Sequence, residues 1–107
     1  MSAATADPRT RRRALAQEAE EEAREALEVA KGALEAEGEE RNLTQAMDAL
    51  RKAWAAHGAL LLHGGELRND FTRRATLAMA DHLRRDVQVL WDRALLEVHT
   101  LEGASHG

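Results

Sequence analysis

The sequence of 107 residues contains no cysteine, a single proline and only three aromatic side chains, Trp54, Phe71 and Trp91. The absence of cysteine excludes disulfides, thiolate metal sites and a thiol nucleophile. Alanine supplies much of the 44% hydrophobic content and buries little area, so the core of one chain is predicted to be small. We therefore expect part of the apolar burial to come from a second chain.

Long hydrophobic runs are also missing, since none approaches the ~20 residues that a membrane-spanning helix needs. No apolar stretch follows the arginines at positions 11–13, so a signal peptide is not expected, and we predict a cytoplasmic protein without a membrane partner. The net charge of −4 lacks the basic excess typical of general nucleic-acid binders. Ser2 and Ser105 are the only serines and lie near the termini, so a serine-based catalytic triad is not expected.

Apolar residues recur with the spacing of α-helices in three long segments of the sequence. The first runs from about residue 8 to residue 37, with Pro8 in its first turn and Gly38 as its stop. Alanines spaced four and three residues apart form a narrow apolar face, opposite a face of glutamates. These alanines are Ala19, Ala23, Ala26, Ala30 and Ala33.

The second segment follows Asn42, which is expected to cap a helix, and ends at Gly64 and Gly65. Its apolar seam has the spacing of a heptad repeat, with His57 as its only polar member. The seam consists of Leu43, Met47, Leu50, Trp54, His57 and Leu61. Gly58 lies inside this helix at a cost of about 1 kcal/mol relative to alanine, which predicts that a neighbouring helix approaches closely there.

The third segment, about residues 66–101, contains neither glycine nor proline. As one helix it would be about 54 Å long and would overhang the shorter second helix, unless it breaks near Asp81 and His82. An overhanging apolar seam calls for a second subunit. The residues predicted to form this interface are Leu83, Val87, Leu90, Trp91, Ala94 and Val98.

Short connections between helices favour antiparallel neighbours. We therefore predict an all-α fold: an antiparallel three-helix bundle with a long C-terminal helix, completed by oligomerisation as a dimer. Residues 8–102 are expected to form a single helical-bundle domain. Residues 1–7 are predicted to be a disordered tail, and residues 103–107 a flexible one.

Two histidines are candidate site residues. His57 is predicted either as a buried imidazole bonded within the core or as a ligand-binding residue inside the bundle. His82 lies beside Asp81 and four residues before Asp86, a set of side chains of the kind that binds zinc. The sequence contains neither His-x-x-x-His nor Glu-x-x-His, however, so we predict no metal site and no cofactor.

Arginines form a run at positions 11–13 and doublets at positions 73–74 and 84–85. The doublets stack on one helix face, an arrangement that suits a phosphate backbone. Each doublet also follows an aspartate at the spacing of ion pairs within a helix, which favours charge balance over nucleic-acid binding. The ion pairs expected at this spacing are Asp70–Arg74, Asp81–Arg85, Glu20–Arg24 and Asp48–Lys52.

A helix with alanine–leucine pairs and a Gly-Glu linker precede residues 46–54 and 60–62. Residues 91–94 and 98–99 near the end of the chain add an Arg-x₅-His spacing to these features. Over about residues 20–101 they resemble HEPN-type domains, which are small, commonly dimeric helical bundles. Many of these cut RNA without a metal, and others are non-catalytic partners of nucleotidyltransferases. The resemblance implies Arg93 and His99 as the catalytic pair, although Arg51 and His57 have the same spacing.

From these patterns we expect a non-enzymatic interaction or regulatory module that acts as a homo-oligomer or docks a partner protein. The resemblance to HEPN domains implies an alternative, a metal-independent ribonuclease or a component of a toxin–antitoxin pair. A second alternative is a bundle that binds a metal or a small ligand around His57 and His82.

Overall fold

The computed structural model describes residues 7–36 and 43–106, which form three α-helices: α1 (Pro8–Glu35), α2 (Leu43–Gly65) and α3 (Asp70–His106). No strand occurs within these residues, so the prediction of an all-helical chain with a long C-terminal helix is confirmed over the described part. None of these helices combines the length and the apolar character needed to cross a bilayer.

The start of α1 follows from two neighbouring residues. The side chain of Asp7 caps the helix by accepting a hydrogen bond from the backbone N–H of Arg9 at 3.2 Å. Pro8 occupies the first turn, as predicted, where its missing N–H leaves no partner unsatisfied. Gly38 and Asn42, the predicted stop of this helix and cap of the next, lie outside the described residues.

The third helix begins later than its predicted start near Glu66. The backbone N–H of Glu66 and that of Leu67 still bond to carbonyls in the last turn of α2, at 3.3 and 3.2 Å. Asn69 then caps α3, because its side-chain oxygen accepts a hydrogen bond from the backbone N–H of Thr72 at 2.9 Å. Residues 66–69 therefore form the connection, and Leu67 turns into the core.

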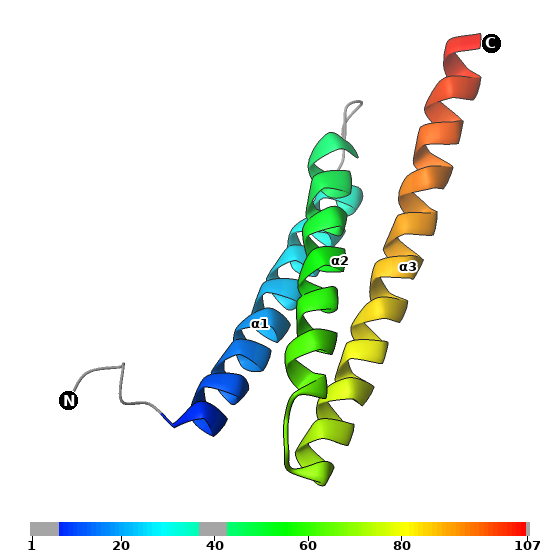
Figure 1. Cartoon of the computed structure of the whole chain (residues 1–107). Helices are drawn as coiled ribbons and strands as arrows, with labels where there is room; N and C mark the ends of the chain where they lie inside the picture. The colour runs from blue at the N-terminus through cyan, green and yellow to red at the C-terminus, as the bar shows by residue number, and fades with distance from the viewer. Residues whose placement is uncertain (1–6, 37–42, 107) are drawn as a thin grey trace.

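Once started, α3 continues without a break through Asp81 and His82 and past Leu101 to His106. Its 37 residues correspond to about 55 Å, which accounts for most of the 62 Å length of the molecule. The C-terminal part projects beyond the start of α2 (Figure 1). Of the two arrangements that the sequence allowed for this segment, the structure has the overhanging helix.

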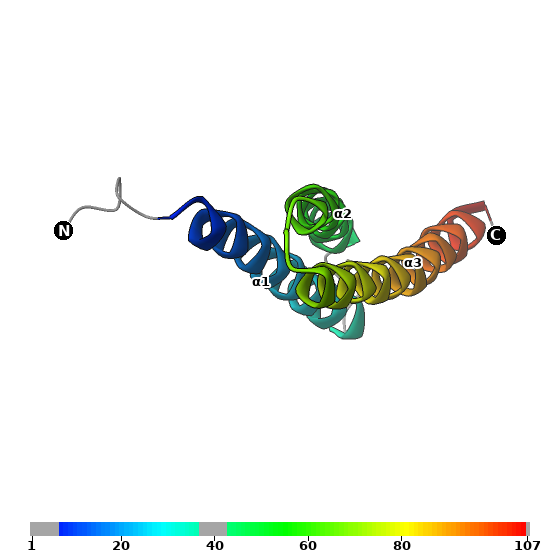
Figure 2. The same cartoon turned by 60° about the horizontal axis from the view of Figure 1, so that its bottom comes forward.

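The second helix is the centre of the bundle, since it packs extensively on α1 and also on α3, whereas α1 and α3 meet less. Figure 2 shows α1 and α3 diverging to opposite sides beneath α2. Among the described residues, eleven of the seventeen buried hydrophobic side chains are alanine. These small side chains let the helix axes approach closely, and the largest fully buried side chains are Leu50, Leu60 and Leu83.

The buried face of α2 is rotated away from the predicted heptad seam. Leu50 and His57 are buried as expected, but Trp54 is 52% exposed and Leu61 is also exposed. The face that packs on α1 and α3 includes a row of alanines instead, namely Ala46, Ala49, Ala53 and Ala56. Because α2 contacts two helices, its buried arc is broad and centres between them rather than on the larger side chains.

The sequence predicted a close helix contact at Gly58, but the structure has this contact at Gly64. A methyl group added at Gly58 meets no atom within 4 Å, because this residue faces solvent. A methyl group at Gly64 would lie 2.8 Å from Cγ2 of Thr76 on α3. Gly64 therefore sets how closely the end of α2 approaches the start of α3.

We expect opposite effects from alanine at these two positions. Gly58→Ala should raise the free energy of unfolding by about 1 kcal/mol, since an exposed helical glycine is replaced by the best helix former. Gly64→Ala should lower it by about 1–2 kcal/mol through the clash with Thr76. Urea unfolding measures both changes, and Thr76→Ser, which removes the clashing methyl group, should restore much of the loss. Equal effects at the two glycines would contradict the assigned contact.

Candidate functional site

His57 is the one polar side chain in the described core. Its ring lies 5.1 Å from the ring of Trp54, centroid to centroid, at an angle of 34°. Burial lowers the pKa of His57 below its usual 6.5, and the positive charge of Arg84 lowers it further, while Asp81 opposes the shift. The ring makes no hydrogen bond to another described residue, in contrast to the bonded imidazole that the sequence suggested.

This environment predicts a pH-dependent stability. The unfolded chain takes up a proton at His57 near pH 6.5 and the folded chain only at lower pH, so acidification favours unfolding in that window. The melting temperature should therefore fall between about pH 7 and about pH 5, and His57→Leu should flatten this dependence. Circular dichroism checks the comparison, with His99→Leu at an exposed position of α3 outside the outer stripe as the control. An unchanged slope in the His57 variant would contradict the prediction.

The remaining histidines do not gather into a site within the described residues. His82 is exposed on α3, and the neighbouring Asp81 accepts hydrogen bonds from Arg84, which hold the pKa of Asp81 below its usual value. His63 is half-buried near the end of α2. Over residues 7–36 and 43–106, no three His, Asp or Glu side chains converge on a position that would hold a metal ion.

The arginine doublets of α3 form the expected ion pairs. Arg74 contacts Asp70 at 3.2 Å and Arg85 contacts Asp81 at 2.8 Å. On α1, Arg24 pairs with Glu20 at 3.7 Å. The fourth expected pair differs, because Asp48 pairs with Arg51, three residues later, at 3.3 Å and not with Lys52. Charge on these faces is therefore largely balanced within each helix.

The geometry does not bring Arg93 and His99 together within one subunit. Both are exposed on the unbroken part of α3. Six residues on a straight helix turn the side chains about 120° apart and separate them by about 9 Å along the axis. Arg51 and His57 have the same separation on α2, and Arg51 is already paired with Asp48.

The predicted interface residues of α3 fall into two groups. Leu83, Val87 and Ala94 are buried in the core of the subunit itself, so they have no surface to offer a second copy. Leu90, Trp91 and Val98 are half-buried at the edges of that core. The apolar seam that the sequence assigned to an interface is thus in large part the seam that holds α3 against α1 and α2.

A second apolar face of α3, which the sequence analysis missed, remains exposed. Phe71, Val89 and Leu96 are 81%, 65% and 67% exposed, the highest values among the large hydrophobic side chains of the described chain. At 100° per residue, these three and several small or polar residues between them share one side of the helix, away from the core. We call this side the outer stripe: Phe71, Ala75, Ala78, His82, Val89 and Leu96.

The spacing of the outer stripe follows the heptad repeat, and this signal was present in the sequence. The stripe was hidden because α3 carries two apolar seams, and the one richer in leucine and valine was the more visible. Its borders carry charge. Asp86 and Arg93 lie along one border, and Arg85 and Asp92 lie along the other.

The charges of the first border lack a bonded partner in the described part of the chain. Neither Asp86 nor Arg93 forms a hydrogen bond or an ion pair with another described residue. On the second border, Arg85 contacts Asp81, and Asp92 accepts a hydrogen bond from Gln88 at 3.0 Å. One border of the outer stripe therefore offers one charge of each sign that no described side chain pairs with.

Comparison of the chain with models of protein families, with curated proteins and with solved structures found no match. The resemblance to HEPN domains stays a prediction that these comparisons do not test.

Proposed function

We propose that this chain is a non-enzymatic interaction module that associates with a second copy of itself through the outer stripe of α3. The observation that carries the proposal is the shared face of Phe71, Val89 and Leu96, the three most exposed large apolar side chains among the described residues. Large apolar side chains that line up on one exposed face are typical of a surface that another helix covers.

The border charges favour an antiparallel pairing of two α3 helices. Val89 lies within half a residue of the midpoint between Asp86 and Arg93, and also of the midpoint between Arg85 and Asp92. A two-fold axis at Val89 therefore sets Asp86 of one copy against Arg93 of the second on one border. It sets Arg85 against Asp92 on the other border. Both borders become complementary through the same axis.

This axis brings two positions of the outer stripe, Val89 and Leu96, into the interface. Val89 meets its own equivalent at the centre, and Leu96 of one copy faces His82 of the second copy. The axis lies close to the middle of α3, so the pairing uses the length of the helix, including the part that projects beyond α2. The overhang, which leaves the monomer with a long uncovered helix, becomes part of a continuous interface.

Sedimentation velocity over a range of protein concentrations tests this proposal. We expect the wild-type chain to sediment as a dimer that dissociates on dilution. Val89→Glu places a carboxylate at the axis against its own equivalent, so this variant should be monomeric. Val29→Glu makes the same change at an exposed valine of α1 and should leave the dimer intact. A wild-type monomer at all concentrations, or equal loss in both variants, would reject the assigned surface.

A further inference from the structure

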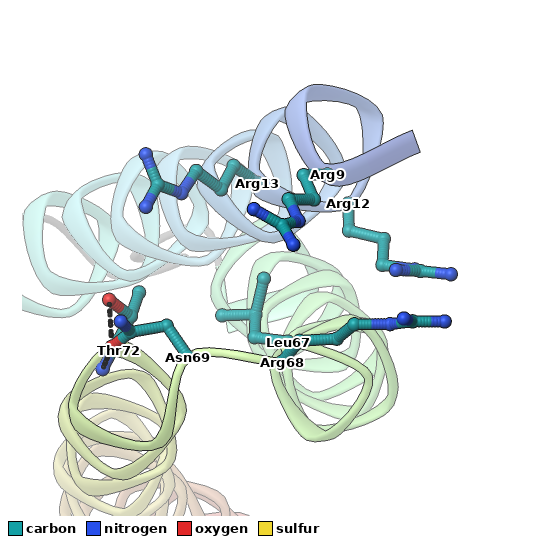
Figure 3. A pocket seen from close by; sticks show the side chains of 7 residues that line it. All are labelled: Arg9, Arg12, Arg13, Leu67, Arg68, Asn69 and Thr72. Carbon is teal, nitrogen blue, oxygen red and sulfur yellow. Dashed lines mark hydrogen bonds between the residues drawn. The ribbon is translucent and has the colours of Figure 1, made fainter. Parts of the chain in front are cut away.

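A pocket of about 270 Å³ lies at the end of the bundle where α1 begins and α2 connects to α3. Three arginines from the first turns of α1, Arg9, Arg12 and Arg13, line it together with Arg68 from the connection (Figure 3). Figure 3 shows the side chain of Leu67 between α1 and the connection that carries it, and this leucine is buried. The pocket thus has an apolar base and an arginine rim.

These four guanidinium groups lack partners among the described residues, unlike most arginines of α2 and α3. Among the described side chains, the guanidinium groups of Arg9, Arg12, Arg13 and Arg68 form no ion pair or hydrogen bond, and only the backbone N–H of Arg9 bonds to Asp7. The first turn of α1 contains no acidic residue. The carboxylate of Asp70, at the start of α3, is already bonded to Arg73 and Arg74. Four positive charges therefore surround one pocket without a carboxylate among its lining residues.

Such a cluster is unfavourable for the chain alone. Like charges repel, and arginines in the first turns of a helix also oppose its dipole. The arrangement becomes favourable when an anion enters, because guanidinium groups donate paired, charge-assisted hydrogen bonds to phosphate oxygens. At the start of α3, the backbone N–H and the hydroxyl of Thr72 already donate hydrogen bonds to the side-chain oxygen of Asn69.

We propose that this pocket binds a small ligand that carries a diphosphate group. Two adjacent phosphates suit Arg12 and Arg68, whose side chains extend toward the same side of the pocket, whereas Arg13 points to the opposite side (Figure 3). The volume is near the lower end of the range for small-molecule sites. Farther along α1, the exposed glutamates Glu18, Glu21 and Glu22 disfavour a long polyanion such as RNA along this helix.

Isothermal titration of the full chain with inorganic pyrophosphate, at constant ionic strength, tests the site. We expect saturable binding of one pyrophosphate per chain. Arg12→Gln and Arg68→Gln should each weaken it about tenfold, the effect of losing a charge-assisted hydrogen bond. Arg11→Gln is the matched control, because Arg11 lies on the same turn of α1 but does not line the pocket. Its dissociation constant should stay within about twofold of the wild-type value.

Three results would overturn the proposal. The first is that the wild-type chain shows no saturable binding of pyrophosphate. The second is that Arg11→Gln weakens pyrophosphate binding as much as Arg12→Gln does. The third is tighter binding of a short single-stranded RNA with equal sensitivity to both substitutions, which would indicate a diffuse basic surface. Val89→Glu should leave pyrophosphate binding unchanged, because every lining residue belongs to one subunit, so failure of the dimer and failure of the site are separate outcomes.

Discussion

Leu50→Ala should lower the free energy of unfolding by about 3 kcal/mol, which makes it one of the most damaging single substitutions in the chain. Leu50 is fully buried where α2 meets α1 and α3, and its neighbours Ala30, Ala46 and Ala53 are themselves fully buried alanines. Alanine side chains have no rotamers with which to fill the space that a leucine leaves. A cavity therefore persists and adds its cost to the lost transfer free energy.

Urea unfolding followed by far-UV circular dichroism measures this loss, at one fixed protein concentration because the proposed dimer would couple stability to concentration. Leu62→Ala provides the control, since Leu62 lies on the same helix and is 61% exposed. Its effect should stay within about 0.5 kcal/mol. Comparable losses in the two variants would mean that Leu50 is not in a packed core.

Asp86→Arg is expected to weaken the proposed dimer about tenfold or more. In the antiparallel arrangement this residue faces Arg93 of the second copy, and the two-fold axis repeats the contact. The substitution therefore replaces two attractions by two repulsions, each about 1 kcal/mol or less at an exposed border. Neither residue has a hydrogen-bond or ion-pair partner among the described residues, so the fold of the monomer should be unaffected.

The double variant Asp86→Arg/Arg93→Asp exchanges the two charges and should restore the dissociation constant toward the wild-type value. Sedimentation equilibrium compares the single and double variants, and added salt should reduce the difference between them. Failure of the double variant to recover, with the single variant impaired, would exclude this register. In that case, the outer stripe would pair in another orientation or cover a different partner.

The sequence was sufficient to predict three helices because their signals are local. Pro8 at the start of α1, the glycines at the end of α2 and the uninterrupted helix formers of α3 act within a turn or two of themselves. The exact start of α3 was misjudged, since Leu67 has the spacing of a helical residue but is buried in the connection. Local patterns do not distinguish these two ways of burying one leucine.

Which apolar face is buried depended on contacts between helices. Leucine-containing seams were predicted to pack, yet α2 packs largely through alanines and leaves Trp54 half-exposed. The periods of the two faces of α3 are the same, so periodicity alone does not tell which face meets its own subunit. The identity of the glycine at the tight contact, Gly64 and not Gly58, likewise depends on a residue of another helix, Thr76.

The sequence by itself determined that this chain is helical, that its core is poor in large side chains and that the arginine doublets of α3 pair within their own helix, because propensity, composition and spacing act over a few residues. Only the tertiary structure decided that α3 overhangs, that the outer stripe stays uncovered and that Arg12 and Arg68 line the same pocket. The physical reason is that these features depend on how helices distant in sequence lie against one another, and close packing of alanines sets that arrangement.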